Sequence, residues 1–207
     1  MGRYTRPTCR LCRREGEKLF LKGEKCASEK CPIKKRPYAP GQHGKTTISK
    51  FSDYKVRLRE KQKARRIYGI SERQFENYFI DARKSKGVTG EKLLETLERR
   101  LDNVVYRLGF ATTRNEGRQL VRHGHFLVND RKVNIPSYQV KPQNIIKVKA
   151  GSVERIKKNI DKLKERKVPK WLSLDEAAMN AKVEAIPKRD DIDAAIDDML
   201  IVEYYSR

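Results

Sequence analysis

Apolar residues in the first part of the chain recur mainly at helical spacing, between polar and basic positions. Residues 53–68 contain neither proline nor glycine and consist largely of helix formers. Either Ser52 or Asp53 is suited to cap the start of this predicted helix, and Gly69 follows its end. A second helix is predicted over residues 71–85. There a serine followed three residues later by a glutamine forms a capping box, and an apolar i, i+3, i+4 pattern follows.

The same spacing continues over residues 93–108, where leucines and valines form one apolar face. We expect this third helix to break near Asp102 and to end at Gly109. A threonine and a glutamate three residues apart form another capping box and predict a short helix over residues 113–123. Gly124 should end that helix in a left-handed cap. The middle of the chain is therefore predicted to be almost entirely helical.

Beyond this point the pattern becomes typical of strands. Residues 126–128 and 131–135 are predicted to pair as a hairpin around an Asn-Asp turn at residues 129–130. Two more short strands are predicted over residues 138–140 and 145–148. The sequence therefore predicts a small sheet that follows the helices.

The end of the chain mixes both patterns. Ser152 precedes a charged helix that is predicted to run to about residue 167. Residues 183–186 and 200–204 are predicted to be strands, which must pair with others to satisfy their backbone groups. Together the helical and strand-like patterns predict an α+β fold.

Charge changes the picture, because it is large and unevenly distributed. The 207 residues include 49 Lys and Arg against 27 Asp and Glu, a net charge of +22. Residues 1–50 have a net charge of +10, residues 51–67 of +5, and residues 101–170 of +11. Residues 171–207, by contrast, have a net charge of −5. This segregation indicates more than one binding surface, and nucleic acid is the commonest polyanionic partner.

Several classes of protein are not indicated. The sequence shows neither an apolar run of the roughly 20 residues that a membrane helix needs nor a secretory signal peptide. It also has no phosphate-binding glycine loop, no serine-nucleophile motif and no zinc-protease motif. We therefore expect an intracellular protein that binds a polyanion, has no contact with a membrane and is not an enzyme.

The four cysteines all lie near the start of the chain. Cys9, Cys12, Cys26 and Cys31 follow the spacing Cys-x2-Cys-x13-Cys-x4-Cys, which is typical of a four-thiolate metal site. Zn2+ is the first expectation, and an iron–sulfur cluster would use the same four ligands. Free thiols and two disulfides are the alternatives, although disulfides are unusual in the cytosol. His43 is a weaker candidate for a further ligand.

Two of the predicted helices carry basic side chains at helical spacing. Without a counter-charge such stripes repel themselves, so both favour phosphate binding over a merely solvated face. The start of the second of these helices adds free N–H groups that suit phosphate. The members of the stripes are Lys55, Arg59, Lys63 and Arg66 in the first helix, and Arg114, Arg118 and Arg122 in the second. Tyr38, Tyr54, Tyr68 and Tyr138 are possible base-stacking residues that could equally serve packing.

These motifs come together in a resemblance to a known family. Residues 99–110, 118–125 and 128–138 resemble the S4 RNA-binding domain, which also occurs in tyrosyl-tRNA synthetases and pseudouridine synthases. Residues 1–4, 36–44, 54–79 and 200–207 extend the resemblance to the bacterial small-subunit ribosomal protein S4 family. The four cysteines match the zinc-type branch of that family.

The resemblance implies a domain organisation within the α+β class. Residues 1–45 would form a metal-bearing N-terminal segment, and residues 46–98 a helical domain. Residues 99–167 would form the inserted small α/β S4 (alpha-L) RNA-binding module. Residues 168–207 would form a C-terminal segment that packs back on the helical domain.

The resemblance also implies partners and a location. The protein would bind small-subunit ribosomal RNA at a junction of its 5′ domain early in assembly, in the cytoplasm. It would lie beside ribosomal protein S5, near the channel through which messenger RNA enters, and affect translational accuracy. The less favoured readings are an RNA-modifying or tRNA-binding protein that carries an S4 module, and a metal-finger DNA regulator. The first would need a separate catalytic constellation, and the second a recognition helix that the sequence lacks.

Charge and resemblance together predict two sets of contact residues. The RNA-binding set is basic or polar and comprises Arg3, Arg10, Arg13, Lys34, Lys35, Arg36, Gln42, His43, Lys55, Arg59, Lys63, Arg66, Arg107, Arg114, Asn115, Arg118, Arg122 and His123. The protein-partner set is acidic and comprises Asp190, Asp191, Asp193 and Glu203. The acidic set should avoid RNA, because a phosphate backbone repels carboxylates.

Overall fold

The computed structural model describes residues 4–46, 52–163 and 167–206. Their contacts divide the chain into two compact units. Met1–Gly90 and Ala194–Arg207 form the first, here called the helical unit. Glu91–Asp193 form the second, here called the sheet unit. Helices and one small antiparallel sheet together make the fold α+β, as the sequence predicts.

The helical unit consists of three short N-terminal helices, two long helices and a C-terminal helix. Its elements are α1 (Cys9–Glu15), α2 (Glu24–Ala27), α3 (Pro32–Lys35), α4 (Asp53–Tyr68), α5 (Glu72–Lys84) and α10 (Asp198–Tyr205). The predicted caps of the long helices are confirmed. Ser52 accepts a hydrogen bond from the backbone of Lys55, and Ser71 accepts one from Gln74. Gly69 ends α4 in the left-handed region, with φ of 63°.

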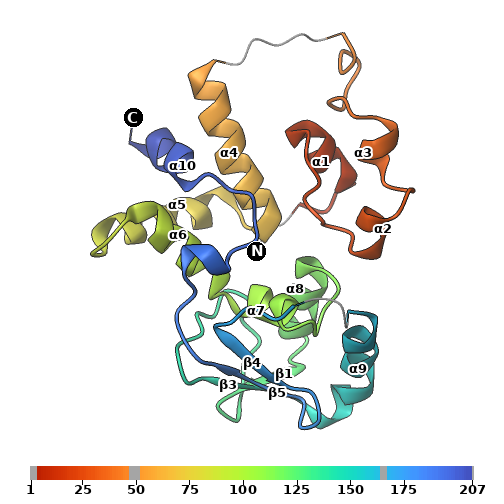
Figure 1. The fold of residues 1–207 in the computed structure, drawn as a ribbon, viewed down its shortest axis with the longest axis vertical. Helices are drawn as coiled ribbons and strands as arrows, with labels where there is room; N and C mark the ends of the chain where they lie inside the picture. The colour runs from red at the N-terminus through yellow and green to blue at the C-terminus, as the bar shows by residue number, and fades with distance from the viewer. Residues whose placement is uncertain (1–3, 47–51, 164–166, 207) are drawn as a thin grey trace. The chain divides into compact units, whose positions relative to one another are not determined.

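The last helix corrects a prediction. Residues 200–204 were expected to form a strand and instead lie in α10, beside α4 and α5 (Figure 1). Asp197 caps the helix by accepting hydrogen bonds from two backbone N–H groups of its first turn. Ile201 is fully buried, and the ring of Tyr205 stacks on Phe79 with centroids 4.5 Å apart. A short apolar run fits the periodicity of a helix or of a strand equally well. The cap at Asp197 and the packing against α4 and α5 therefore decide that this run is helical.

The sheet unit places helices on an antiparallel sheet of five strands, in the order β2-β1-β3-β5-β4. Its helices are α6 (Thr89–Glu98, which begins at the boundary), α7 (Leu101–Arg107), α8 (Arg114–Arg122) and α9 (Val153–Lys162). Its strands are β1 (Phe126–Val128), β2 (Arg131–Lys132), β3 (Ile145–Val148), β4 (Leu172–Asp175) and β5 (Asn180–Val183). Short 3-10 helices cover Ala150–Ser152 and Arg189–Asp191.

Most predicted elements of the sheet unit are present with shifted bounds. Thr113 caps α8 as expected, and Gly124 has φ of 72°. The hairpin forms, although β2 is only two residues long. The strand predicted over residues 138–140 is wrong, because a single bridge between Arg100 and Gln139 replaces it. The long helix breaks just before Leu101, which agrees with the predicted break near Asp102.

The C-terminal half of the unit differs more. The strand predicted over residues 183–186 is wrong except at Val183, because the strand found there, β5, spans Asn180–Val183 and pairs with both β3 and β4. Strands β4 and β5 therefore complete the sheet of the S4-like region, so residues 168–207 divide between the two units. The side chain of Ser152 does not cap α9, and the predicted end of that helix partly lies outside the described residues.

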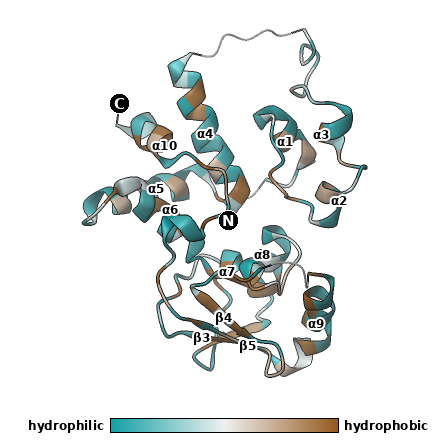
Figure 2. Ribbon diagram, viewed as in Figure 1, coloured by the Kyte–Doolittle hydropathy of each residue, from teal (hydrophilic) through white to brown (hydrophobic). Residues whose placement is uncertain are grey.

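The core of the sheet unit lies between the sheet and its helices. It includes Phe110, Phe126, Ile146 and Ile156, all fully buried, and Trp171, which is 2% exposed. Figure 2 shows the apolar residues of β3, β5 and α9 within this layered unit. None of the described helices is both long and apolar enough to cross a membrane.

Candidate nucleic-acid interface

The first basic stripe lies on α4, and its members Arg59, Lys63 and Arg66 are held by carboxylates of the same unit. Glu15, at the end of α1, is 2% exposed in its side chain and accepts hydrogen bonds from both Arg59 and Arg66 on one oxygen. Burial raises the pKa of Glu15, and the two guanidinium groups partly oppose that rise. Lys63 pairs with Glu60 at 2.9 Å and with Glu17 at 3.4 Å. The stripe is therefore a positioned set of cations rather than a row of unrestrained ones.

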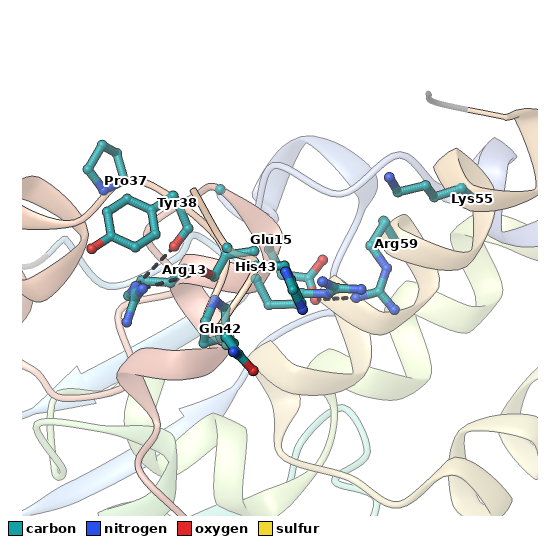
Figure 3. Close-up of a pocket in the computed structure, with 14 residues that line it drawn as sticks. Arg13, Glu15, Pro37, Tyr38, Gln42, His43, Lys55 and Arg59 are labelled. Atoms are coloured by element: carbon teal, nitrogen blue, oxygen red, sulfur yellow. Dashed lines mark hydrogen bonds and ion pairs between the residues drawn. The ribbon is translucent and has the colours of Figure 1, made fainter. Parts of the chain in front are cut away.

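A pocket of about 630 Å³ opens beside this stripe. It lies between α1, the loop after α3 and the first turns of α4 (Figure 3). Its lining residues are Arg13, Arg14, Glu15, Gly16, Pro37, Tyr38, Ala39, Pro40, Gly41, Gln42, His43, Gly44, Lys55 and Arg59. Five of them, Arg13, Gln42, His43, Lys55 and Arg59, belong to the predicted RNA-binding set.

Sequence reasoning left Arg14 and Tyr38 out of its RNA-binding set, although both line the pocket. Of the four tyrosines weighed as stacking residues, Tyr68 is buried and Tyr138 packs against the core of the sheet unit. Tyr54 lies beside Tyr204, with ring centroids 5.9 Å apart. Tyr38, which lines the pocket, is therefore the best placed of the four for stacking on a base. In the sequence, its position between two prolines in a glycine-rich segment could have singled it out.

The second basic stripe, on α8, separates into buried and accessible members. Arg118 is 6% exposed and lies 3.7 Å from a carboxylate oxygen of Asp102. Arg114 donates a hydrogen bond to Asn103 at 2.7 Å, and its guanidinium lies 4.4 Å from the centre of the Tyr106 ring. Further along the stripe, Arg122 and the following His123 are exposed, and Asn115 is half-buried.

Arg107 is buried in ion pairs within the sheet unit. It is 7% exposed, donates two hydrogen bonds of 2.9 Å to Glu98, and donates another of 2.8 Å to Asp193. Glu98 ends the preceding helix α6, whereas Asp193 lies 86 residues away, so local pattern gave no signal of the pairing with Asp193. Lys63 on α4, 9% exposed and paired with Glu17 and Glu60, has a similar setting. Arg107, Arg118 and Lys63 are therefore not part of the RNA surface proposed below.

The remaining predicted RNA contacts lie in the N-terminal segment. Arg13 is half-buried, and Arg3 lies outside the described residues. The exposed members of the set are Arg10, Lys34, Lys35, Arg36, Gln42 and His43. Because they lie on α1, α3 and the following loop, they extend the cationic surface around the pocket.

The acidic residues expected at a protein partner have different settings. Asp190 is exposed, and Asp191 is half-buried and accepts a hydrogen bond from the backbone of Lys188 at 3.0 Å. The exposed carboxylate of Asp193 pairs with Arg107, and that of Glu203 pairs with Arg57 at 2.5 Å. Each of the last two therefore already neutralises a cation of its own unit.

The four cysteines come from α1, α2 and the start of α3. Cys12, Cys26 and Cys31 are buried, Cys9 is half-buried, and no disulfide joins them. Burial raises the pKa of Cys12, and the nearby thiols of Cys26, Cys9 and Cys31 add to the rise. The backbone N–H of Lys22 donates to the sulfur of Cys26 at 3.3 Å.

The donor set is compatible with a metal in its chemistry, because it offers buried thiols of which two receive backbone hydrogen bonds. The second is Cys12, where a bond from the backbone of Leu19 lowers the thiol pKa against the effect of burial. Such bonds also stabilise metal-bound thiolates. Within residues 4–46, 52–163 and 167–206, however, no three His, Cys, Asp or Glu side chains lie close enough together to hold an ion.

Two family models match consecutive parts of the chain, which together span residues 3–146. The model described as ribosomal protein S4/S9 N-terminal domain matches residues 3–98. The model described as S4 domain matches residues 99–146. The second match covers α7, α8 and the β1–β2 hairpin, which defines the class of this module.

Full-length relatives carry the comparison further. The chain is 57% identical to the small ribosomal subunit protein uS4 of Thermus thermophilus, over the whole of both chains. It is 58% identical to the protein of the same name from Geobacter sp. and 54% identical to that from Dictyoglomus thermophilum, again over full length. The chain therefore belongs to the family of small ribosomal subunit protein uS4.

Proposed function

We propose that the chain is a structural, RNA-binding constituent of the small subunit of the cytoplasmic ribosome, and not an enzyme. Identity of 57% over the full length of both chains carries this conclusion. The fold agrees with it, because cationic surfaces occur in both the helical and the sheet unit. The ligand is small-subunit ribosomal RNA.

The finer proposal is that the protein binds a junction in the 5′ domain of that RNA and helps to nucleate assembly. Support comes from two strongly basic regions of sequence, residues 1–67 and 101–170, each of which contributes accessible cations. Two such surfaces can contact two RNA helices, which a junction offers and a simple duplex does not.

Salt dependence and single substitutions test this proposal. Binding of a 5′-domain RNA fragment should weaken steeply with salt, with a slope of about one for each neutralised phosphate. Arg122→Gln should lower that slope by about one. Arg83→Gln is the matched control, because Arg83 is an exposed arginine of α5 outside the predicted set. Equal effects of the two changes would contradict a role for α8 in RNA contact.

We further propose that the four cysteines hold one structural Zn2+, as in the zinc-type branch of the family, with an iron–sulfur cluster as the alternative. The burial of three thiols and the backbone hydrogen bonds to Cys12 and Cys26 support this. A bound metal would stabilise a segment that has little apolar core of its own. Its ligands would be thiolates of Cys9, Cys12, Cys26 and Cys31.

Elemental analysis of protein purified under reducing conditions without chelator tests the metal proposal. One zinc per chain is expected, and visible absorbance with bound iron would identify a cluster instead. Cys26→Ser should lower the metal content and loosen the N-terminal segment, while Trp171 in the sheet unit remains buried. Wild-type protein that contains neither metal would refute the site.

The acidic residues support a third proposal, which concerns ribosomal protein S5 and translational accuracy near the path of messenger RNA. Asp190 and Asp193 expose carboxylates on a segment that phosphate would repel. Changing Asp190, Asp191 and Asp193 to Asn should therefore loosen a protein contact and raise misreading, with little loss of RNA affinity. Unchanged accuracy together with a large loss of RNA affinity would instead place this segment at the RNA.

A further inference from the structure

The pocket beside α4 has two chemically different ends. Figure 3 shows Tyr38 and Arg13 at one end, Lys55 and Arg59 at the other, and Gln42 and His43 between them. Four of the lining side chains are cationic, and the single carboxylate, Glu15, is engaged by arginines. Any ligand of this pocket is therefore expected to be anionic at one end.

The aromatic end is rigid. The guanidinium of Arg13 lies 4.9 Å from the centre of the Tyr38 ring. Its Nε donates a hydrogen bond of 3.0 Å to the carbonyl of Tyr38, and Nη2 donates one of 3.4 Å to that of Ala39. The Nζ of Lys45 also lies over this ring, 5.4 Å from its centre. Because the bonds of Arg13 fix its guanidinium to the loop, ring and guanidinium form a stacking platform, on which a planar group would displace the flexible Lys45 or stack on the guanidinium at little ordering cost.

The cationic end is also pre-arranged. Glu15, at the end of α1, accepts a hydrogen bond from Arg59 of α4, and the same carboxylate oxygen accepts one from Arg66, about two turns further along α4. The side chain of Glu15 is 2% exposed, so water competes little for these contacts. Arg14 and Lys55 line the same pocket. Glu15 thus positions a guanidinium at the point where a phosphate would meet it.

We infer that this pocket takes a single unpaired RNA nucleotide, with its base on the Tyr38–Arg13 platform and its phosphate near Lys55 and Arg59. The inference rests on the proposed function and adds a nucleotide subsite to it. A volume of about 630 Å³ is within the range of small-molecule sites. A base that is paired inside a duplex cannot offer its face to a protein ring, so the nucleotide must be unstacked.

A short single-stranded RNA that carries 2-aminopurine at one position is the probe, used with the full chain. Stacking of the fluorescent base on Tyr38 should quench its emission as the complex forms. Tyr38→Leu should abolish the quench and weaken binding roughly tenfold, whereas Tyr38→Phe should retain both. Tyr4→Leu is the matched control, because Tyr4 is an exposed tyrosine of the same unit outside the pocket.

The cationic end has its own matched pair. Arg14 on α1 and Arg83 on α5 are both exposed arginines of the helical unit, and only Arg14 lines the pocket. Arg14→Gln should weaken binding of the short RNA several-fold more than Arg83→Gln. Equal losses would mean that the oligonucleotide senses general charge only.

Several outcomes would overturn the subsite. One is a fluorescence quench that survives Tyr38→Leu. Another is an oligonucleotide with an abasic position that binds as tightly as the intact one. The third is a 5-bromouridine probe whose photo-cross-links map away from the loop of Tyr38. The cross-link uses wild-type protein, so it decides the matter even if a variant fails to fold. If the wild type binds the 5′-domain fragment but not the short RNA, only the subsite is refuted. Failure to bind that fragment would refute the proposed function itself.

Discussion

The buried ion pair at the start of α7 allows a quantitative test of how the sheet unit is stabilised. Arg100 is fully buried, and its Nε and Nη2 donate hydrogen bonds of 3.1 and 2.9 Å to the two carboxylate oxygens of Asp102. Asp102 also accepts a bond of 3.0 Å from the backbone of Asn103. We predict that Asp102→Ala strongly destabilises this unit, because a buried guanidinium loses its counter-charge.

The size of the effect follows from the burial of both partners. Removing one partner of a buried ion pair costs about 3–5 kcal/mol, most of it for the charge that is left behind. A typical domain has a net stability of about 5–15 kcal/mol, so the loss is a large share of the total. Replacing both partners, as in Arg100→Met with Asp102→Leu, should recover only part of it, because the buried Arg118, 3.7 Å from Asp102, also loses that counter-charge.

Urea unfolding followed by tryptophan fluorescence is the assay. Trp171 is the only tryptophan and is 2% exposed in the core of the sheet unit, so its emission reports the unfolding of that unit. Glu184→Ala is the control, since Glu184 forms a surface pair with Lys182 at 3.4 Å that should contribute about 0–1 kcal/mol. A loss for Asp102→Ala no larger than that of the control would refute the reasoning.

Three further predictions concern individual side chains. Burial opposes the charged form of Glu72, but hydrogen bonds from Lys61 and Tyr205 outweigh it and hold the pKa below its ordinary value of 4.5. The stability that this carboxylate contributes is thus present above about pH 4.5 and is lost as the pH falls through the lowered pKa. Glu72→Gln should therefore reduce the fall in unfolding free energy at acid pH, as measured by circular dichroism. Gly117→Ala should destabilise the sheet unit by about 1–3 kcal/mol in urea, although alanine favours helix, because its Cβ would lie 2.7 Å from a backbone oxygen of α7; a gain in stability would contradict this. Asp197→Ala should cost the helical unit about 1 kcal/mol through loss of the α10 cap, and thermal melts unchanged by the substitution would show that the cap is dispensable.

Much of the candidate site was predictable, because the types and spacing of its residues carry the chemistry. The four cysteines, the α4 stripe and the loop that includes Gln42 and His43 were all identified from the sequence. The pocket was not, since it needs α1 and α4 to be held together by Glu15, whose contacts with Arg59 span 44 residues. A glutamate in a basic segment gives no local sign that it will be buried.

The sequence by itself determined the features that depend on neighbours a few residues away. The caps at Ser52, Ser71 and Thr113, the left-handed glycines and the hairpin turn all arise from bonds within one or two turns of chain. Tertiary structure alone decided which charges are available to a partner. Arg107 meets Asp193 across 86 positions, and Arg57 meets Glu203 across 146. It also decided that residues 200–204 are helical, because burial of an apolar run depends on the surface it meets, and that surface belongs to distant parts of the chain.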